Sequence, residues 1–167
     1  MSKYWGNRLA RTQTRLTSKS QRQIDKQMRQ YYKKATETIV KEFEATYNHI
    51  VATQSAGHDI TPADLYKLDK YWQLQAQMRR ELKKLGDKQI SLLSKAFEMN
   101  WFDIYYSINI DGLAAYNTLD INGVRTVLNQ VWCADGRTWC SRIWTNTKLL
   151  QQELSDNLID CIVSGRK

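Results

Sequence analysis

The sequence predicts an all-α protein, an elongated helical bundle with a long basic amino-terminal helix or arm. Helix-breaking residues are scarce, because Pro62 is the only proline and the 167 residues include 7 glycines. Apolar residues recur at spacings of three and four along most of the chain, which is the period of a helix with one buried face. No stretch of useful length alternates apolar and polar residues as a half-buried strand does.

The overall composition is that of one globular domain and argues against several other classes of protein. Hydrophobic residues make up 42% of the chain and charged residues 25%, as in ordinary soluble proteins. No run approaches the roughly 18 apolar residues that a membrane span needs, and residues 1–25 lack the apolar region of a secretory signal. We therefore expect no membrane partner, and a protein kept in cytoplasm or in something assembled there.

Positive charge is concentrated at the start of the chain. The formal net charge is +8, but residues 1–34 hold ten Lys or Arg against the single acid Asp25, a net +9. The remaining residues hold 15 basic against 16 acidic side chains, a net −1. This asymmetry predicts a basic amino-terminal helix or arm over residues 1–34, a helical body over residues 35–167, and an acidic partner for the first of these.

Eight basic residues within that segment form what we call the basic stripe. Its members are Arg8, Arg11, Arg15, Lys19, Arg22, Lys26, Arg29 and Lys33. Their mean spacing is about 3.6 residues, one helical turn, so on a continuous helix they share one face over about 39 Å. Like charges at this spacing repel one another. The stripe therefore indicates a partner that neutralises it.

Double-stranded DNA is the partner that this pattern favours. Each neutralised phosphate releases condensed counterions, which rewards a linear array of cations. Five of the eight residues are Arg, which can contact phosphate through two hydrogen bonds. The intervening residues are mostly Gln, Thr and Ser, so we expect binding that is independent of base sequence. A helix that lies on a membrane surface needs a broad apolar face opposite its charges. Before residue 24 the segment offers little more than Leu9 and Leu16, so this interpretation is weaker.

Two other interpretations of the stripe remain open. It could be a solvated or disordered arm that keeps the protein soluble, because charge runs usually are solvated. It could also dock on an acidic protein surface or a partner helix and never meet DNA.

The first helix of the body is expected over residues 35–54, continuous with the basic segment. Its buried face is expected to consist of Tyr31, Ala35, Ile39, Phe43, Tyr47 and Ile50. A second helix is expected over residues 62–85, with Thr61 as N-cap, Pro62 in the first helical position, Asp64 closing a capping box and Gly86 ending the helix. Its apolar side is expected to hold Leu65, Leu68, Trp72, Leu82 and Leu85.

Three further helices complete the prediction. The third spans residues 88–110 and has the most regular apolar period, formed by Ile90, Leu93, Phe97, Trp101, Ile104 and Ile108. A short helix over residues 121–132 carries Val124, Val127, Leu128 and Val131. After a turn at ADGRT, a last helix over residues 141–164 carries Ile143, Thr147, Leu150, Leu154, Leu158 and Cys161, with Gly165 as its C-cap.

No residue pattern predicts a catalytic site, a metal site or a cofactor. The carboxylates are scattered singly, and no glycine-rich phosphate loop is present. Cys133, Cys140 and Cys161 are odd in number and far in sequence from both histidines, so we expect free thiols. Ser141 begins the last predicted helix and is interpreted as a cap. A nuclease would require clustered carboxylates and a divalent metal.

Two stretches resemble a known family. KYWGNR near the start contains Tyr4, Trp5 and Arg8, and GRTWCSRIWTNTKLLQQELSDNLIDCIVSG near the end contains an Arg-Ile-Trp-x-Asn element. Their order resembles that of the amino-terminal region of the tailed-phage minor head proteins, the head-morphogenesis family related to the F protein of phage Mu. The matching residues of the second stretch are Arg142, Ile143, Trp144 and Asn146, and the helix that follows ends at a glycine, here Gly165.

The resemblance implies a non-enzymatic structural component of the virion, inside the capsid near the portal, that acts in head assembly or in DNA packaging and ejection. It implies portal or capsid proteins as partners and carries over no catalytic residue. Tyr4 and Trp5, which precede the stripe, would anchor a partner. Members of that family usually continue beyond the glycine, so the resemblance implies a fragment or a short relative. Leftover apolar helix surface would allow a homo-oligomer.

Overall fold

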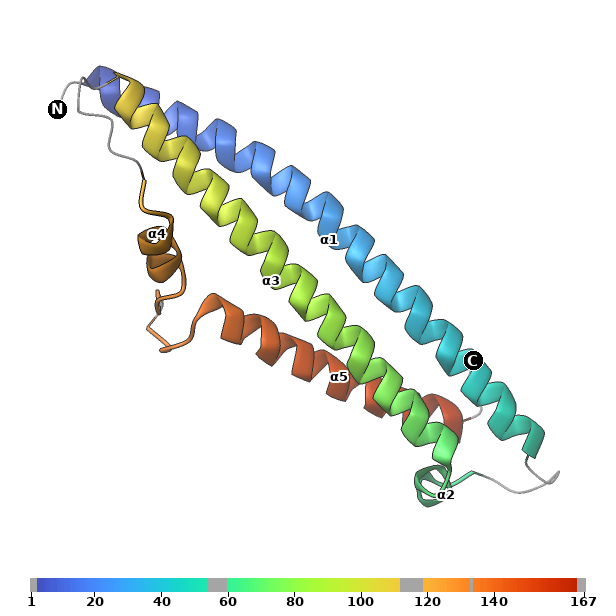
Figure 1. Cartoon of the computed structure of the whole chain (residues 1–167). Coiled ribbons are helices and arrows are strands. Elements are labelled where there is room, and N and C mark those ends of the chain that lie inside the picture. The colour runs from blue at the N-terminus through green and yellow to red at the C-terminus, as the bar shows by residue number, and fades with distance from the viewer. Residues whose placement is uncertain (1–2, 54–59, 112–118, 133, 165–167) are drawn as a thin grey trace. The chain divides into compact units, whose positions relative to one another are not determined.

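The computed structural model describes residues 3–53, 60–111, 119–132 and 134–164, and all regular structure in these ranges is helical (Figure 1). The protein is therefore all-α, as predicted. The helices are α1 (Lys3–Thr53), α2 (Pro62–Tyr66), α3 (Asp69–Asp111), α4 (Ile121–Leu128) and α5 (Trp139–Val163). The elongated bundle and the separate basic arm remain predictions.

The chain divides into two compact units, and both long helices contribute to each of them. The first unit combines residues 1–30 with residues 89–142, and the second combines residues 31–88 with residues 143–167. The first thus contains the opening part of α1, the later part of α3 and all of α4. The second contains the end of α1, α2, the start of α3 and most of α5. The predicted division at residue 34 stays a prediction.

The second unit has a well-buried apolar core in two clusters. One cluster joins α1, α3 and α5 through Ala35, Ile39, Leu74, Met78, Leu82, Leu85 and Leu158. The other joins α1, α2, α3 and α5 through Ile50, Leu65, Tyr71 and Ile162. Tyr31, Phe43 and Tyr47 pack against these clusters, so the apolar face predicted for the end of α1 is confirmed.

The first unit is held by fewer buried side chains and by specific polar contacts. Val124 and Leu128 of α4 are its buried apolar residues among those described. Arg125 Nε donates to Glu98 Oε1 at 2.8 Å, which ties α4 to α3. The rings of Phe97 and Trp139 meet edge to face, with centroids 5.5 Å apart.

The predicted helix end at Gly86 is wrong. Instead of separate helices over residues 62–85 and 88–110, the chain forms the short α2 and then one helix, α3, that passes through Gly86 without a break. A Cβ atom at Gly86 would lie 2.7 Å from Cζ3 of Trp144 on α5. The glycine is therefore needed for the close approach of this ring, which only the tertiary structure reveals.

The capping box predicted before α2 is confirmed, but α2 ends after one turn. Thr61 caps the helix, and Asp64 Oδ2 accepts from the Thr61 backbone N–H at 3.3 Å. The Thr61 hydrogen bonds and, to a smaller extent, Lys67 lower the pKa of the Asp64 carboxyl. The Tyr66 carbonyl accepts from the indole N–H of Trp72 at 2.9 Å. Trp72, predicted on the apolar side, is consequently 49% exposed.

Helix α4 ends at Leu128 and not at residue 132 as predicted. Two tryptophan indoles donate to the backbone carbonyls at this end. Trp132 Nε1 donates to the Val127 carbonyl at 2.9 Å, and Trp139 Nε1 donates to the Leu128 carbonyl at 3.0 Å. These bonds satisfy carbonyls that a continuing helix would have used. Val127 is left 38% exposed, so the predicted apolar face of this helix is buried only in part.

The last helix begins two residues earlier than predicted, because Thr138 and not Ser141 is its N-cap. Thr138 Oγ1 accepts from the Ser141 backbone N–H at 3.2 Å, and Ser141 Oγ donates to the Thr138 carbonyl at 2.8 Å. The expected turn before the helix is present, with Gly136 at φ +70°. The predicted cap at Gly165 lies outside the described residues.

Candidate nucleic-acid interface

All eight residues of the basic stripe lie on the single helix α1. At 100° per residue they fall within an arc of about 80° around the helix axis. The seven whose side chains are described are all exposed. They are Arg11, Arg15, Lys19, Arg22, Lys26, Arg29 and Lys33. The side chains of Arg8, Tyr4 and Trp5 lie outside the description, so the anchoring role predicted for the last two stays a prediction.

Within the first unit the stripe faces away from α3. The half-buried residues of the same stretch are Ser20, Ile24, Gln27 and Met28. Their mean direction around the helix axis is about 170° from that of the stripe. Ser20 Oγ donates to Asn100 Oδ1 of α3 at 2.9 Å, which identifies the packed side of α1. The stripe is therefore open to a partner approaching α1 from its free side.

Little negative charge opposes the stripe. Among the described residues its one ion pair joins Lys33 to Glu37 at 3.9 Å, and both side chains are more than 60% exposed. Such a surface pair contributes little. The six other described side chains of the stripe have no carboxylate in ion-pair range within the described parts of the chain. Their charge is available to an external anion.

Apart from the exposed Asp25, the exposed side chains between the stripe residues of the first unit are small or uncharged. Thr14, Ser18, Gln21, Gln23 and Gln30 are exposed, and the Thr14 hydroxyl already donates to the Ala10 carbonyl at 2.8 Å. No aromatic ring is found among residues 6–30, so this part of the surface lacks the stacking platforms that proteins use to hold unpaired bases; the exposed ring of Tyr32 lies beyond it, next to Lys33. The surface suits the phosphates of a duplex.

The Arg-Ile-Trp-x-Asn element, residues 142–146, has contacts that stabilise the fold. Arg142 Nη2 donates to both carboxylate oxygens of Asp135, at 2.9 and 2.8 Å, which ties the turn to the first part of α5. The Arg137 backbone N–H and Arg142 lower the pKa of the Asp135 carboxyl. Trp144 packs on Gly86 in the second unit. Ile143 is half-buried and Asn146 is exposed.

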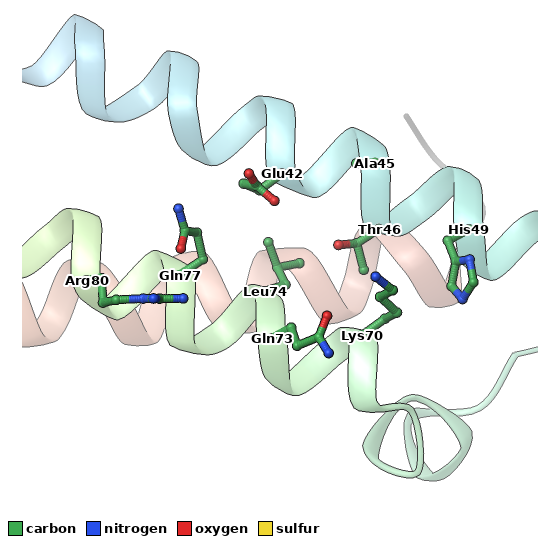
Figure 2. A pocket seen from close by; sticks show the side chains of 9 residues that line it. All are labelled: Glu42, Ala45, Thr46, His49, Lys70, Gln73, Leu74, Gln77 and Arg80. Carbon is green, nitrogen blue, oxygen red and sulfur yellow. The ribbon is translucent and has the colours of Figure 1, made fainter.

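A polar groove in the second unit was not expected from the sequence. It encloses about 510 Å³ between α1 and α3 (Figure 2). Glu42, Thr46 and His49 line it from α1, and Lys70, Gln73, Gln77 and Arg80 line it from α3 (Figure 2). Acidic and basic side chains both line this groove, so it selects neither for anions nor for cations.

A second groove of the same unit is more distinctive because three lysines line it. Lys34 and Tyr31 come from α1, and Lys84 and Lys88 come from α3. We call it the lysine groove. Arg80, Lys84 and Lys88 are spaced by four residues, a signal present in the sequence. The groove was not predicted, because the net charge of residues 35–167, summed over all faces of the helices, is near neutral.

The metal ligands, cysteines and apolar helices in the described parts of the chain indicate no further functional site. No group of three or more His, Cys, Asp or Glu side chains there could hold a metal ion. Cys140 and Cys161 are free thiols, as predicted, and burial raises the pKa of Cys140. Cys133 lies outside the described residues. The described helices include none that is long and apolar enough to cross a membrane.

Comparisons of the chain with protein families, with curated protein sequences and with solved structures find no match.

Proposed function

We propose that this protein binds double-stranded DNA through the basic stripe, without regard to base sequence and without catalysing a reaction. The observation that carries the proposal is that the seven described stripe side chains are all exposed on one face of α1. Within the first unit that face is opposite the packed side of the helix. A row of cations presented in this way can neutralise several phosphates at once and release their counterions.

The biological setting that we propose is the interior of a phage head, near the portal. Support comes from the resemblance of the KYWGNR and RIWTN stretches to the tailed-phage minor head proteins. In that setting the stripe contacts packaged DNA, and the helical body contacts portal or capsid proteins or further copies of the chain. The protein then aids head assembly, packaging or ejection.

Fluorescence anisotropy with a random-sequence duplex tests the DNA proposal. The wild type is compared, from about 50 to 200 mM salt, with a variant in which five stripe arginines are replaced by Gln. These are Arg8, Arg11, Arg15, Arg22 and Arg29. About five neutralised phosphates give a log–log salt slope steeper than about −4, and the variant should lose this binding.

A control variant removes the same charge from elsewhere on the exposed surface. It carries Gln in place of Lys67, Arg79, Lys83, Arg137 and Lys148, all of them exposed and outside the stripe. This control should keep most of the salt slope. If wild type and both variants are equally indifferent to DNA, the proposal is wrong. The stripe would then be a docking surface for an acidic protein or a solubilising arm, and a complex that survives nuclease treatment of an extract would distinguish the first from the second.

A further inference from the structure

We propose that the lysine groove of the second unit is a phosphate-binding site, separate from the basic stripe. Lys34, Lys84 and Lys88 converge there from two helices that are distant in sequence. The groove would hold one phosphate group, either from a nucleic-acid backbone or from a small phosphorylated molecule. This inference does not depend on DNA binding by the stripe.

Positive charge in the groove exceeds negative charge. Glu81 is the one carboxylate in its lining, and Lys84 Nζ already contacts Glu81 Oε1 at 2.6 Å. Within the described parts of the chain, neither Lys34 nor Lys88 has a carboxylate in ion-pair range. Three ammonium groups against one carboxylate repel one another, and an anion between them removes that repulsion.

Contacts already present restrict where two of the lysines can go. Lys88 Nζ lies 5.4 Å from the centre of the Tyr31 ring, in range of a cation–π interaction. Glu81, whose side chain is only 14% exposed, holds Lys84. Because these side chains are partly positioned before any anion arrives, less conformational entropy is lost on binding. Each ammonium carries three N–H donors, of which Lys84 already gives one to Glu81, so the remaining donors of the three lysines can face a phosphate in the groove.

The size and floor of the groove suit a phosphate group better than a whole nucleotide. Its volume is about 170 Å³, below the roughly 300 Å³ at which pockets for larger organic ligands begin. The buried side chains of Ala35 and Leu85 belong to its lining. The three lysines themselves are exposed, so a phosphate can reach them from solvent while it rests against this apolar lining.

Amide NMR of the full chain, titrated with pyrophosphate at constant ionic strength, tests the inference. We expect saturable shifts at residues 31–35 and 84–88. Replacing Lys34 and Lys88 by Gln should weaken this binding at least tenfold, whereas replacing both by Arg should retain it. The matched control is the Lys67→Gln and Lys83→Gln pair, since both lysines are exposed in the same unit and contact other carboxylates. Binding by this control should stay within twofold of wild type.

Two results would overturn the inference. One is the absence of saturable shifts at these residues in the wild type. The other is equal weakening by the Gln pair in the groove and by the control pair. Circular dichroism confirms that each variant keeps its helix content, and the Arg variant guards against misreading a folding defect as lost binding.

The source of the phosphate is assigned by repeating the titration with inorganic phosphate, with a nucleotide and with a short duplex. These titrations use the variant in which the five stripe arginines are replaced by Gln. Shifts at residues 84–88 with duplex in this variant assign a nucleic-acid backbone, and shifts with the small molecules alone assign a free phosphate compound. Pyrophosphate binding should persist even if the stripe does not bind DNA, so the two proposals fail separately.

Discussion

Replacing Gly86 by Ala should destabilise the protein, although alanine is the better helix former. In an exposed helix this exchange stabilises by about 0.8–1 kcal/mol. At Gly86 the new methyl group would lie 2.7 Å from Cζ3 and 3.0 Å from Cη2 of Trp144, well inside the roughly 3.5–4.0 Å of a normal carbon contact. Overpacking of this kind costs about 1–3 kcal/mol. The net result should be a loss of about 1 kcal/mol.

The same exchange should have the opposite effect once the ring is gone. A Trp144→Ala background removes the three atoms nearest to the added methyl group, so Gly86→Ala should stabilise by about 1 kcal/mol there. The two values together give a coupling of about 2 kcal/mol between the residues. Urea unfolding of the four proteins, followed by circular dichroism, measures each term. A Gly86→Ala protein more stable than wild type, or a coupling near zero, would refute the reasoning.

Three further predictions concern other parts of the fold. Met78 is fully buried, so Met78→Ala should cost about 2–5 kcal/mol in urea unfolding; a loss below 1 kcal/mol would contradict the core assignment. Thr138→Ala removes the cap of α5 and should cost about 0.5–2 kcal/mol, whereas an unchanged unfolding midpoint would show that another group caps the helix. The hydrogen bonds and charge of Arg125 lower the pKa of Glu98. That contribution to stability is present above the ordinary carboxyl pKa of about 4.3 and is lost as pH falls through the lower folded pKa. The stability difference between wild type and Glu98→Gln should therefore shrink between pH 7 and pH 3, and a constant difference would argue against the pair.

Local patterns in the sequence were enough to predict the helical class and much of the core. The spacing from Tyr31 to Ile50 correctly identifies the packed side of α1, because a helix carries its own period in its sequence. Thr61 and Asp64 likewise predict a helix start, since capping depends on neighbouring residues alone. The shared face and exposure of the stripe follow from the same local geometry.

Contacts between distant residues decided what the sequence could not predict. Gly86 followed by a polar segment is a typical helix end, yet the ring of Trp144 makes the same glycine part of a packed helix interior. The indole of Trp72 ends α2 by bonding the Tyr66 carbonyl, which no periodicity reveals. The lysine groove was missed because Lys34 and Lys84 are brought together by helix packing.

The account depends most on the claim that the stripe acts as a row and not merely as net charge. Exchanging Arg22 with Gln23 and Arg29 with Gln30 keeps composition and charge but moves two cations by about 100° around α1. The measurement is the log–log salt slope of duplex binding for this variant and for wild type. Loss of two phosphate contacts should make the slope shallower by about 1.8. Identical slopes would contradict the account, because position along the face would then not matter.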